Sequence, residues 1–254
     1  RPSPGLAMLI SLERLGFDGR IFPVNPKYAE VGGHACFASL QDLPEAPDLV
    51  LFCTSAAPIL EQLRAAAERG ARAAVIYDGG FAERGEAGAR LQAELAQLCA
   101  EAGIVLCGPN CMGIVSPHDR ATSFLQELRD PEGLAGNVGF ISHSGSICSG
   151  MLTDLRRYGF SYAISCGNEA VVTLADYIDA LIDDTATRVI GLFIECVRQP
   201  ERFVAALDRA AAAGKPVVAL KVGRSERTRR AITSHTGGLT GPADIFSAVL
   251  RAHR

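Results

Sequence analysis

The sequence predicts an α/β protein with two doubly wound domains, in which helices cover both faces of mostly parallel sheets. Short runs rich in β-branched residues are apolar on both faces, which is typical of buried parallel strands. Segments with helical periodicity alternate with these runs along the chain, as in doubly wound folds. A polar, proline-containing stretch at residues 116–136 interrupts the series once and indicates a domain boundary.

In the first half, residues 1–125, four strands are predicted at 21–25, 48–54, 73–78 and 104–108. Helical stretches are predicted at 6–16, 58–70 and 88–103. Each of these helices ends on a glycine, a residue that frequently terminates helices because it tolerates the left-handed conformation. We expect this half to form a Rossmann-like domain.

In the second half, residues 126–254, strands are predicted at 138–143, 162–166, 189–196 and 216–222. Helices are predicted at 146–159, 174–183, 201–214 and 242–254. The same alternation with short loops predicts a flavodoxin-like doubly wound domain here.

Composition excludes several classes of protein. A net charge of −3 gives no support for nucleic acid or an anionic membrane as a partner, and no apolar run approaches a membrane span. Eight cysteines without a CxxC pair, several of them in apolar runs, are expected to be reduced core residues of a cytoplasmic protein. No metal-ligand spacing is found. Because the chain begins at Arg1 and stops at Arg254 within a helical pattern, we expect a fragment of a longer protein.

The loops after the first four strands carry the candidate cofactor-binding residues, because ligands of doubly wound folds lie beyond the carboxyl ends of the strands. In chain order these residues are Asn25, Lys27, Thr54, Ser55, Asp78, Gly79, Gly80, Asn110 and Cys111. Each loop alone is a weak signal, and Ser55 has the alternative role of a helix cap. Four such loops in succession predict a cofactor cleft.

The first of these loops indicates which cofactor is bound. Nicotinamide-binding domains place an acidic residue at this strand end to bind the ribose hydroxyl. Here Asn25, Pro26 and Lys27 stand there instead. A lysine pairs with phosphate as a point charge, so this loop favours a phosphorylated ribose, as in CoA or NADP. The alternative role for Lys27 is that of a solvated surface residue.

The second half offers an anion site and a carboxylate. Ser144, Gly145 and Ser146 follow a predicted strand and open a helix, whose N-terminus can bind phosphate or can be an ordinary cap. Glu195 closes an apolar strand, where a carboxylate is costly unless it is paired. The alternative for Glu195 is a position at the rim, facing water.

His235 is the candidate catalytic residue. It is flanked by small residues in the segment SHTGG, which suits an exposed loop more than a packed core. A neutral histidine can accept a phosphoryl group as a nucleophile. A carboxylate on its other ring nitrogen would hold the tautomer, and Glu195 is the candidate for that role. The other histidines, His34, His118, His143 and His253, are assigned surface or structural roles.

The motifs VNPK, YDGGFAE, GPNCMG, SHSGS, SCGN, FIE and SHTGG occur in this order along the chain. In this order they resemble the NDP-forming acyl-CoA synthetases, relatives of the succinyl-CoA synthetase α subunit and of ADP-forming acetyl-CoA synthetases. The resemblance covers essentially the whole chain, and the SHTGG and GPNC segments are its most specific parts.

The resemblance implies a CoA-binding domain with Lys27 near the CoA phosphates and the other strand-end loops lining the cleft. It implies that His235 is the phosphohistidine, that Glu195 supports it and that Ser144–Ser146 hold its phosphate. ATP and Mg²⁺ would bind an ATP-grasp domain or β subunit that these 254 residues lack. The product would be an acyl-CoA made from a carboxylic acid through an acyl phosphate, by a homo- or hetero-oligomer.

Three alternatives stay open from the sequence. A nicotinamide-dependent dehydrogenase is disfavoured by the lysine of VNPK and by the SHTGG loop. A non-catalytic CoA-binding regulatory protein would resemble the first half only. Another member of the superfamily, such as a citrate- or malate-directed CoA ligase or lyase, shares these motifs. The sequence selects neither the carboxylic acid nor ATP over GTP.

Overall fold

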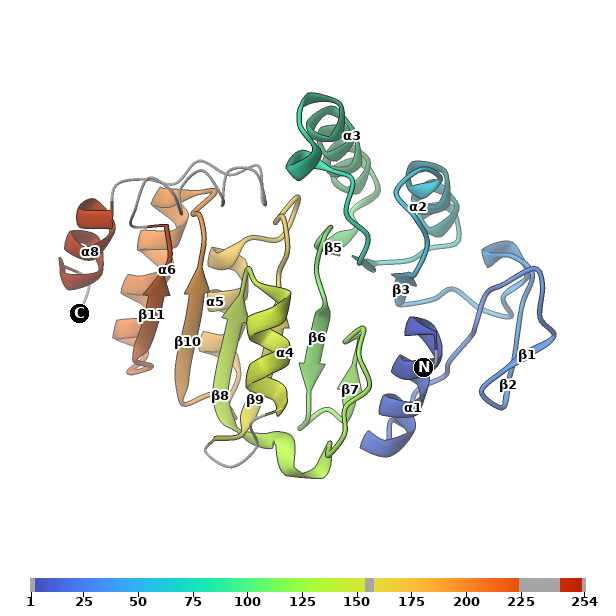
Figure 1. Cartoon of the computed structure of the whole chain (residues 1–254), viewed down its shortest axis with the longest axis horizontal. Coiled ribbons are helices and arrows are strands. Elements are labelled where there is room, and N and C mark those ends of the chain that lie inside the picture. Colours follow the sequence, from blue (N-terminus) through green and yellow to red (C-terminus); the bar gives the residue numbers. More distant parts are fainter. Residues whose placement is uncertain (1–2, 154–157, 224–242, 253–254) are drawn as a thin grey trace.

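The computed structural model describes residues 3–153, 158–223 and 243–252. Both halves combine parallel sheets with flanking helices, which confirms the predicted α/β class (Figure 1). None of the helices within these described ranges is long and apolar enough to cross a lipid bilayer.

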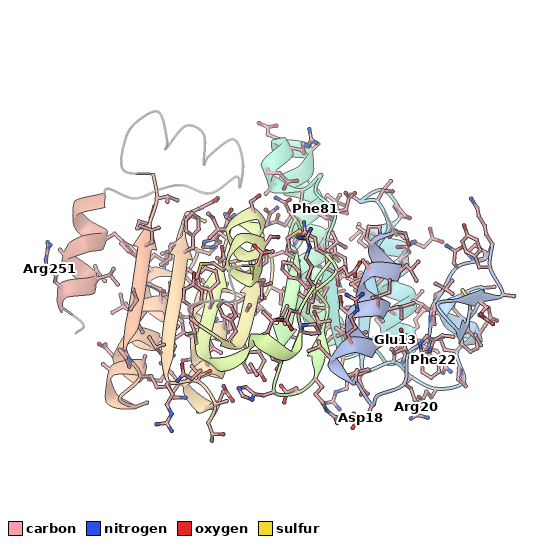
Figure 2. The ribbon with its side chains drawn as sticks, turned by 60° about the horizontal axis from the view of Figure 1, so that its bottom comes forward. Glu13, Asp18, Arg20, Phe22, Phe81 and Arg251 are labelled. Carbon is pink, nitrogen blue, oxygen red and sulfur yellow. The ribbon has the colours of Figure 1, made fainter. Side chains whose placement is uncertain are left out.

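The first half is built on a parallel sheet of β3 (Leu49–Phe52), β4 (Ala73–Ile76) and β5 (Val105–Cys107). Around it lie α1 (Pro4–Leu15), α2 (Ile59–Glu68), α3 (Glu86–Ala102) and the short helices η1 (Leu40–Asp42) and η2 (Ala82–Arg84). Phe81, labelled in Figure 2, is fully buried in this core. A Cβ on Gly88 would lie 1.9 Å from the Phe81 carbonyl oxygen, so glycine allows α3 to pack at this point.

The predicted strand at 21–25 is wrong. Only Val24 forms an isolated bridge, to Phe37, and its side chain is exposed. Pro23 and Pro26 lack the N–H groups that a ladder needs, which explains why no strand forms. Phe22, labelled in Figure 2, packs edge-on against Phe37 with ring centroids 5.8 Å apart.

A small antiparallel hairpin lies beside this segment instead. It pairs β1 (Glu30–Val31) with β2 (His34–Ala35). Gly32 and Gly33 form its turn with φ values of 58° and 81°. Two successive positive φ angles are those of a type I′ turn, which glycine adopts without strain.

The second half is a six-stranded sheet in the order β11-β10-β8-β9-β6-β7. Its strands are β6 (Gly113–Ser116), β7 (Ala121–Thr122), β8 (Ala135–Ser142), β9 (Phe160–Ser165), β10 (Val189–Ile194) and β11 (Val217–Lys221). The four strands β11, β10, β8 and β9 are parallel, which confirms the predicted series. In Figure 1, α4 (Gly145–Thr153) covers one face of this sheet, and α5 (Leu174–Asp183) and α6 (Pro200–Ala212) cover the other. The short helix η3 (Glu132–Leu134) precedes β8 in the chain. The last helix, α8 (Ala243–Ala252), lies beside β11.

The β6–β7 hairpin was not predicted. It lies before residue 125 but pairs antiparallel with β9, so hydrogen bonding joins it to the second sheet. The halves also share core contacts: the Tyr77 hydroxyl donates to the Ser123 carbonyl at 2.6 Å, and the Ala170 N–H donates to the Gly108 carbonyl at 3.0 Å. The division into residues 1–125 and 126–254 stays a prediction.

The eight cysteines are free thiols. Six of them are buried, as expected for core residues, whereas Cys36 is half-buried and Cys53 is exposed. Burial raises the pKa of the Cys99 and Cys196 thiols to about 11. These two groups are therefore protonated thiols at neutral pH.

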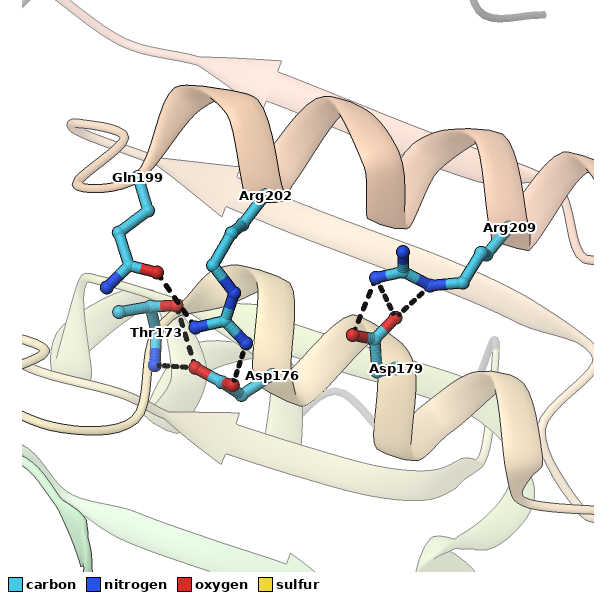
Figure 3. A network of polar contacts seen from close by, with 6 residues as sticks. All are labelled: Thr173, Asp176, Asp179, Gln199, Arg202 and Arg209. Atoms are coloured by element: carbon cyan, nitrogen blue, oxygen red, sulfur yellow. Dashed lines mark hydrogen bonds and ion pairs between the residues drawn. The ribbon is translucent and has the colours of Figure 1, made fainter.

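A polar network fastens α5 to α6 (Figure 3). Asp176 accepts hydrogen bonds from the Thr173 N–H and hydroxyl, both at 2.8 Å, and so closes a capping box at the start of α5. Its other oxygen accepts from Arg202 of α6 at 2.6 Å. Further along the two helices, Arg209 donates to Asp179 from Nε at 2.9 Å and from Nη2 at 2.7 Å, which makes a bidentate pair.

Replacing Asp176 by alanine should lower the free energy of unfolding by about 1–2 kcal/mol, because it removes the cap and the contact with α6. Burial acts to raise the pKa of Asp176, but hydrogen bonds from Thr173 and Arg202 outweigh it and hold the pKa below its usual value. The stabilisation is therefore present at neutral pH and is lost as the pH falls through this lowered pKa.

Urea denaturation at neutral pH and near pH 3 measures both effects. Asp179→Ala is the matched control on the same helix, since its pair with Arg209 is similarly exposed but closes no capping box and should contribute only ~0.5 kcal/mol. Equal losses in the two variants, or a loss for Asp176→Ala that does not shrink at acid pH, would contradict this account of the cap.

Candidate active site

Three of the four predicted cofactor loops meet at the carboxyl edge of the β3–β4–β5 sheet. The carboxylate of Asp78 accepts a hydrogen bond from the Ala56 N–H at 2.8 Å, which ties its loop to that of Thr54 and Ser55. The Asp78 carbonyl accepts from the Asn110 N–H at 3.0 Å. Thr54 and Ser55 are exposed, and the Thr54 hydroxyl donates to Gln62 of α2 at 2.6 Å.

Glycines allow these loops to approach each other. A Cβ on Gly79 would lie 3.0 Å from the Glu83 carboxylate, and Gly80 has a φ of 110° that favours glycine. A Cβ on Gly80 would also come within 3.2 Å of Ala56. Glycine at these two positions therefore lets the loops after β3 and β4 pack closely together.

Glu83 binds the loop of Gly79 and Gly80, here called the glycine loop, and connects it to the second half of the chain. Its carboxylate accepts from the N–H groups of Gly80 and Phe81, and from the side-chain amide of Asn168 at 2.6 Å. Burial acts to raise the pKa of Glu83, but the bonds from Asn168 and Gly80 outweigh it and lower the pKa. Asn168 also accepts from the Asn110 amide at 3.2 Å.

The remaining predicted cofactor residues lie differently. Asn25 accepts from the Lys27 N–H at 3.0 Å in a local turn, and the Lys27 side chain is exposed. Cys111 is buried, and its thiol donates to the Ile76 carbonyl at 3.4 Å. Cys111 therefore offers a ligand its backbone rather than its thiol.

The predicted helix start at residues 144–146 is confirmed. Ser144 caps α4, because its hydroxyl accepts from the Ile147 N–H at 3.4 Å. A Cβ on Gly145 would lie 2.5 Å from the Met112 side chain, so a larger residue would require Met112 to move. Ser146 is exposed at the helix N-terminus, where the dipole favours an anion.

Glu195 follows β10 and is buried, with 8% of its surface exposed, so the alternative of a water-facing rim position is wrong. Its N–H donates to Nδ1 of His143 at 3.1 Å. Its carbonyl accepts from Nζ of Lys221 at 2.9 Å. Because β8 and β10 are adjacent and pair Ser142 with Phe193, Glu195 and the start of α4 lie at the same sheet edge.

The buried carboxylate of Glu169 and the thiol of Cys166 lie close to the His143 ring. Nε2 of His143 is 3.2 Å from the Glu169 carboxylate, and both side chains are 1% exposed. The ligand atoms of His143, Cys166 and Glu169 lie within 4.8 Å of one another, close enough for a metal ion. However, burial raises the pKa of the Cys166 thiol, which donates to the Ser142 carbonyl at 3.3 Å. A metal ion would have to displace the proton of this thiol before the sulfur could bind it.

His235 lies outside the described residues. Of the two predicted catalytic residues, the structure therefore places Glu195 alone.

Sequence reasoning missed His143, Glu169, Lys221 and Glu83 as parts of the site. Three of these residues lie at or shortly after the carboxyl ends of parallel strands in the sheet that contains β10, namely His143, Glu169 and Lys221. Ligands of doubly wound folds bind at this edge, so the position after a strand could have identified these residues as candidates. Glu83 belongs to the YDGGFAE motif. The local sequence does not reveal that these side chains turn inward.

Comparison with known proteins matches both halves. Residues 3–117 match the family model of a CoA binding domain, and residues 135–254 match that of a succinyl-CoA ligase like flavodoxin domain. The chain is 37% identical over 250 residues to a trans-feruloyl-CoA synthase from an unknown prokaryotic organism, covering 97% of this chain and 35% of that protein. It is 34% identical to the α subunit of ADP-forming acetate–CoA ligase II from Pyrococcus furiosus, covering 92% of this chain and 50% of that one.

Among solved structures, the dinucleotide-forming acetyl-coenzyme A synthetase 1 of Ca. Korarchaeum cryptofilum, in complex with phosphate and ADP, superimposes with a TM-score of 0.90 at 28% identity. That match covers 99% of this chain and 54% of the other. The chain thus spans about half or less of the length of these relatives. Two domains of the expected kinds, in the expected order and with relatives of one kind along the whole chain, lead to one conclusion: the chain belongs to the NDP-forming acyl-CoA synthetase family.

Proposed function

We propose that this chain is the part of an ATP-dependent acid–CoA ligase that binds CoA and carries the phosphoryl group on His235. The observation that supports this most is Glu195, a buried carboxylate at the end of β10, beside the helix N-terminus of Ser144–Ser146. A carboxylate that orients a histidine and a helix start that binds its phosphate are the two groups that a phosphohistidine needs.

The proposed reaction has three steps. A ring nitrogen of His235 attacks the γ-phosphorus of ATP, and ADP leaves. A carboxylate oxygen of the acid substrate then attacks the same phosphorus, which breaks the P–N bond and restores the histidine. The CoA sulfur finally attacks the acyl carbon of the acyl phosphate, and inorganic phosphate leaves with the thiol proton.

CoA would occupy the cleft at the carboxyl edge of the β3–β4–β5 sheet. The glycines Gly79 and Gly80 let the loops approach each other there, and Asp78 and Asn110 tie the loops into one surface. The exposed ammonium of Lys27 would pair with a CoA phosphate.

ATP and Mg²⁺ would bind an ATP-grasp module, present either as a further domain or as a β subunit in a homo- or hetero-oligomer. The relatives are about two to three times as long as this chain, which leaves room for that module. We propose a carboxylic acid as the second substrate.

The complete ligase, incubated with Mg²⁺ and ATP labelled at the γ-phosphate, tests this function. We expect a label on His235 that is stable to base and labile to acid, and that is released when a carboxylic acid and CoA are added. Failure of the protein to become labelled, or release of the label by water alone at the same rate, would overturn the proposal.

Replacing Lys27 by alanine should raise the Kd for CoA by about 5- to 10-fold, because one exposed phosphate contact is lost. The difference should shrink at high salt, since an exposed pair is screened. Calorimetry of CoA and NAD binding measures this effect. Arg90→Ala removes a charge from the exposed face of α3 and serves as the control. Binding of NAD without CoA would sink the assignment of the cleft.

A further inference from the structure

We propose that His143 and Lys221 are positioning residues that hold the peptide groups of Glu195, with Glu169 fixing the tautomer of His143. This inference rests on the proposed function, in which Glu195 supports the phosphohistidine.

The backbone of Glu195 is held by side chains on both sides. Its N–H donates to Nδ1 of His143 at 3.1 Å, and its carbonyl accepts from Nζ of Lys221 at 2.9 Å. At the end of a strand such groups normally meet backbone or water. Here the two partners come from the ends of the strands on either side, β8 and β11, and both are at least nine-tenths buried.

The contact at Nδ1 determines the protonation of His143. An imidazole nitrogen that accepts an N–H bond carries no proton, so in neutral His143 the proton is on Nε2. Nε2 lies 3.2 Å from the Glu169 carboxylate, within ion-pair range although not aligned as a hydrogen bond, so the protonated nitrogen of this tautomer faces a carboxylate. Glu169 thus acts on Glu195 through His143, as carboxylates act on ligand histidines in metal sites.

Lys221 completes the arrangement from the other side. Its ammonium group donates to the carbonyls of Glu195 and Val222 at the ends of β10 and β11. A buried ammonium and a buried imidazole–carboxylate pair are costly, because these groups lose their hydration. Apolar side chains would fill the same space without that cost, so the arrangement points to a requirement for the position of Glu195.

Position matters because phosphoryl transfer depends on alignment. A misplacement of about 1 Å in a reacting group can reduce the rate about 100-fold. We call the two contacts of His143 and Lys221 with the Glu195 backbone the clamp. The clamp fixes the position of the Glu195 main chain, and therefore of its Cα atom, and does not use the carboxylate, which in the proposed function acts on the phosphohistidine.

Two variants of His143 in the complete ligase separate positioning from folding. Asparagine places an oxygen where Nδ1 stands and keeps the acceptor for the Glu195 N–H, whereas glutamine places its amide near Nε2 and keeps the contact with Glu169. We expect His143→Gln to slow labelling of His235 by about 10- to 100-fold with an unchanged KM for CoA. We expect His143→Asn to restore most of this rate. Equal rates for wild type and both variants, or better rescue by glutamine, would overturn the inference.

Lys221 provides an independent pair. Lys221→Met removes the donor, whereas Lys221→Arg keeps one, and the methionine variant should be about 10-fold slower in labelling than the arginine variant. If the His143 variants do not fold, judged by thermal denaturation, this pair decides, and equal rates in it would overturn the inference.

A readout that needs no catalysis is ¹⁵N NMR of histidine-labelled chain. His143, assigned by its absence in the variants, should appear as a neutral imidazole with the proton on Nε2. The opposite tautomer would overturn the inference. If the wild-type ligase itself is not labelled by ATP, the proposed function fails. If the wild type is labelled and the variants are labelled at the same rate, only the inference about the clamp is rejected.

Discussion

Replacing His235 by asparagine should abolish acyl-CoA formation by the complete ligase, with a loss of about 10⁴-fold or more in kcat/KM. The proposed reaction passes through a covalent bond to this residue, and asparagine has no ring nitrogen to form it. Removal of the group that carries the intermediate leaves only the binding contributions of the site. Binding of CoA should stay unchanged, because the proposed CoA site lies in the first half of the chain.

Labelling by γ-labelled ATP and steady-state turnover check this prediction. His118→Asn is the control, since His118 is exposed and its Nε2 contacts a backbone carbonyl, that of Gly136, at 2.7 Å. A His235→Asn enzyme that retains label or turnover at the wild-type level would mean that the phosphoryl group is carried elsewhere or transferred directly.

Replacing Glu195 by glutamine should slow both transfers to and from His235 by about 100- to 1,000-fold. The glutamine side chain has nearly the same shape but no charge, so it cannot stabilise the positive charge that develops on the imidazole during attack. The backbone contacts with His143 and Lys221 do not depend on the side chain and should persist.

The two transfers can be followed separately, with ATP and with an acyl phosphate as the phosphoryl donor. Both should slow by the same factor, because Glu195 would act on the histidine that they share. Glu201→Gln, at the exposed start of α6, is the matched control of equal charge change. Slowing of only the ATP-dependent transfer would place Glu195 at the nucleotide rather than at the histidine.

The predicted strands from 48–54 onward and all seven predicted helices correspond to elements of the structure, because both depend on local periodicity and glycine stops. The strand at 21–25 failed because Pro23 within it and Pro26 directly after it have no N–H to donate to a ladder. The β6–β7 hairpin was missed because its strands are four and two residues long, too short to produce a period. It exists because β9 offers it an edge.

The sequence by itself determined the order of strands and helices, the strand-end loops in which the candidate site lies, and the family. These features are local: they depend on residue types that follow each other directly along the chain. Only the tertiary structure decided that Glu195 is buried, that His143 and Lys221 bind its backbone, and that Glu83 joins the glycine loop to Asn168. The partners in these contacts are 52, 26 and 85 residues apart along the chain. Side chains so distant in sequence meet only when parallel strands are assembled side by side, and no local pattern records which of them will face one another.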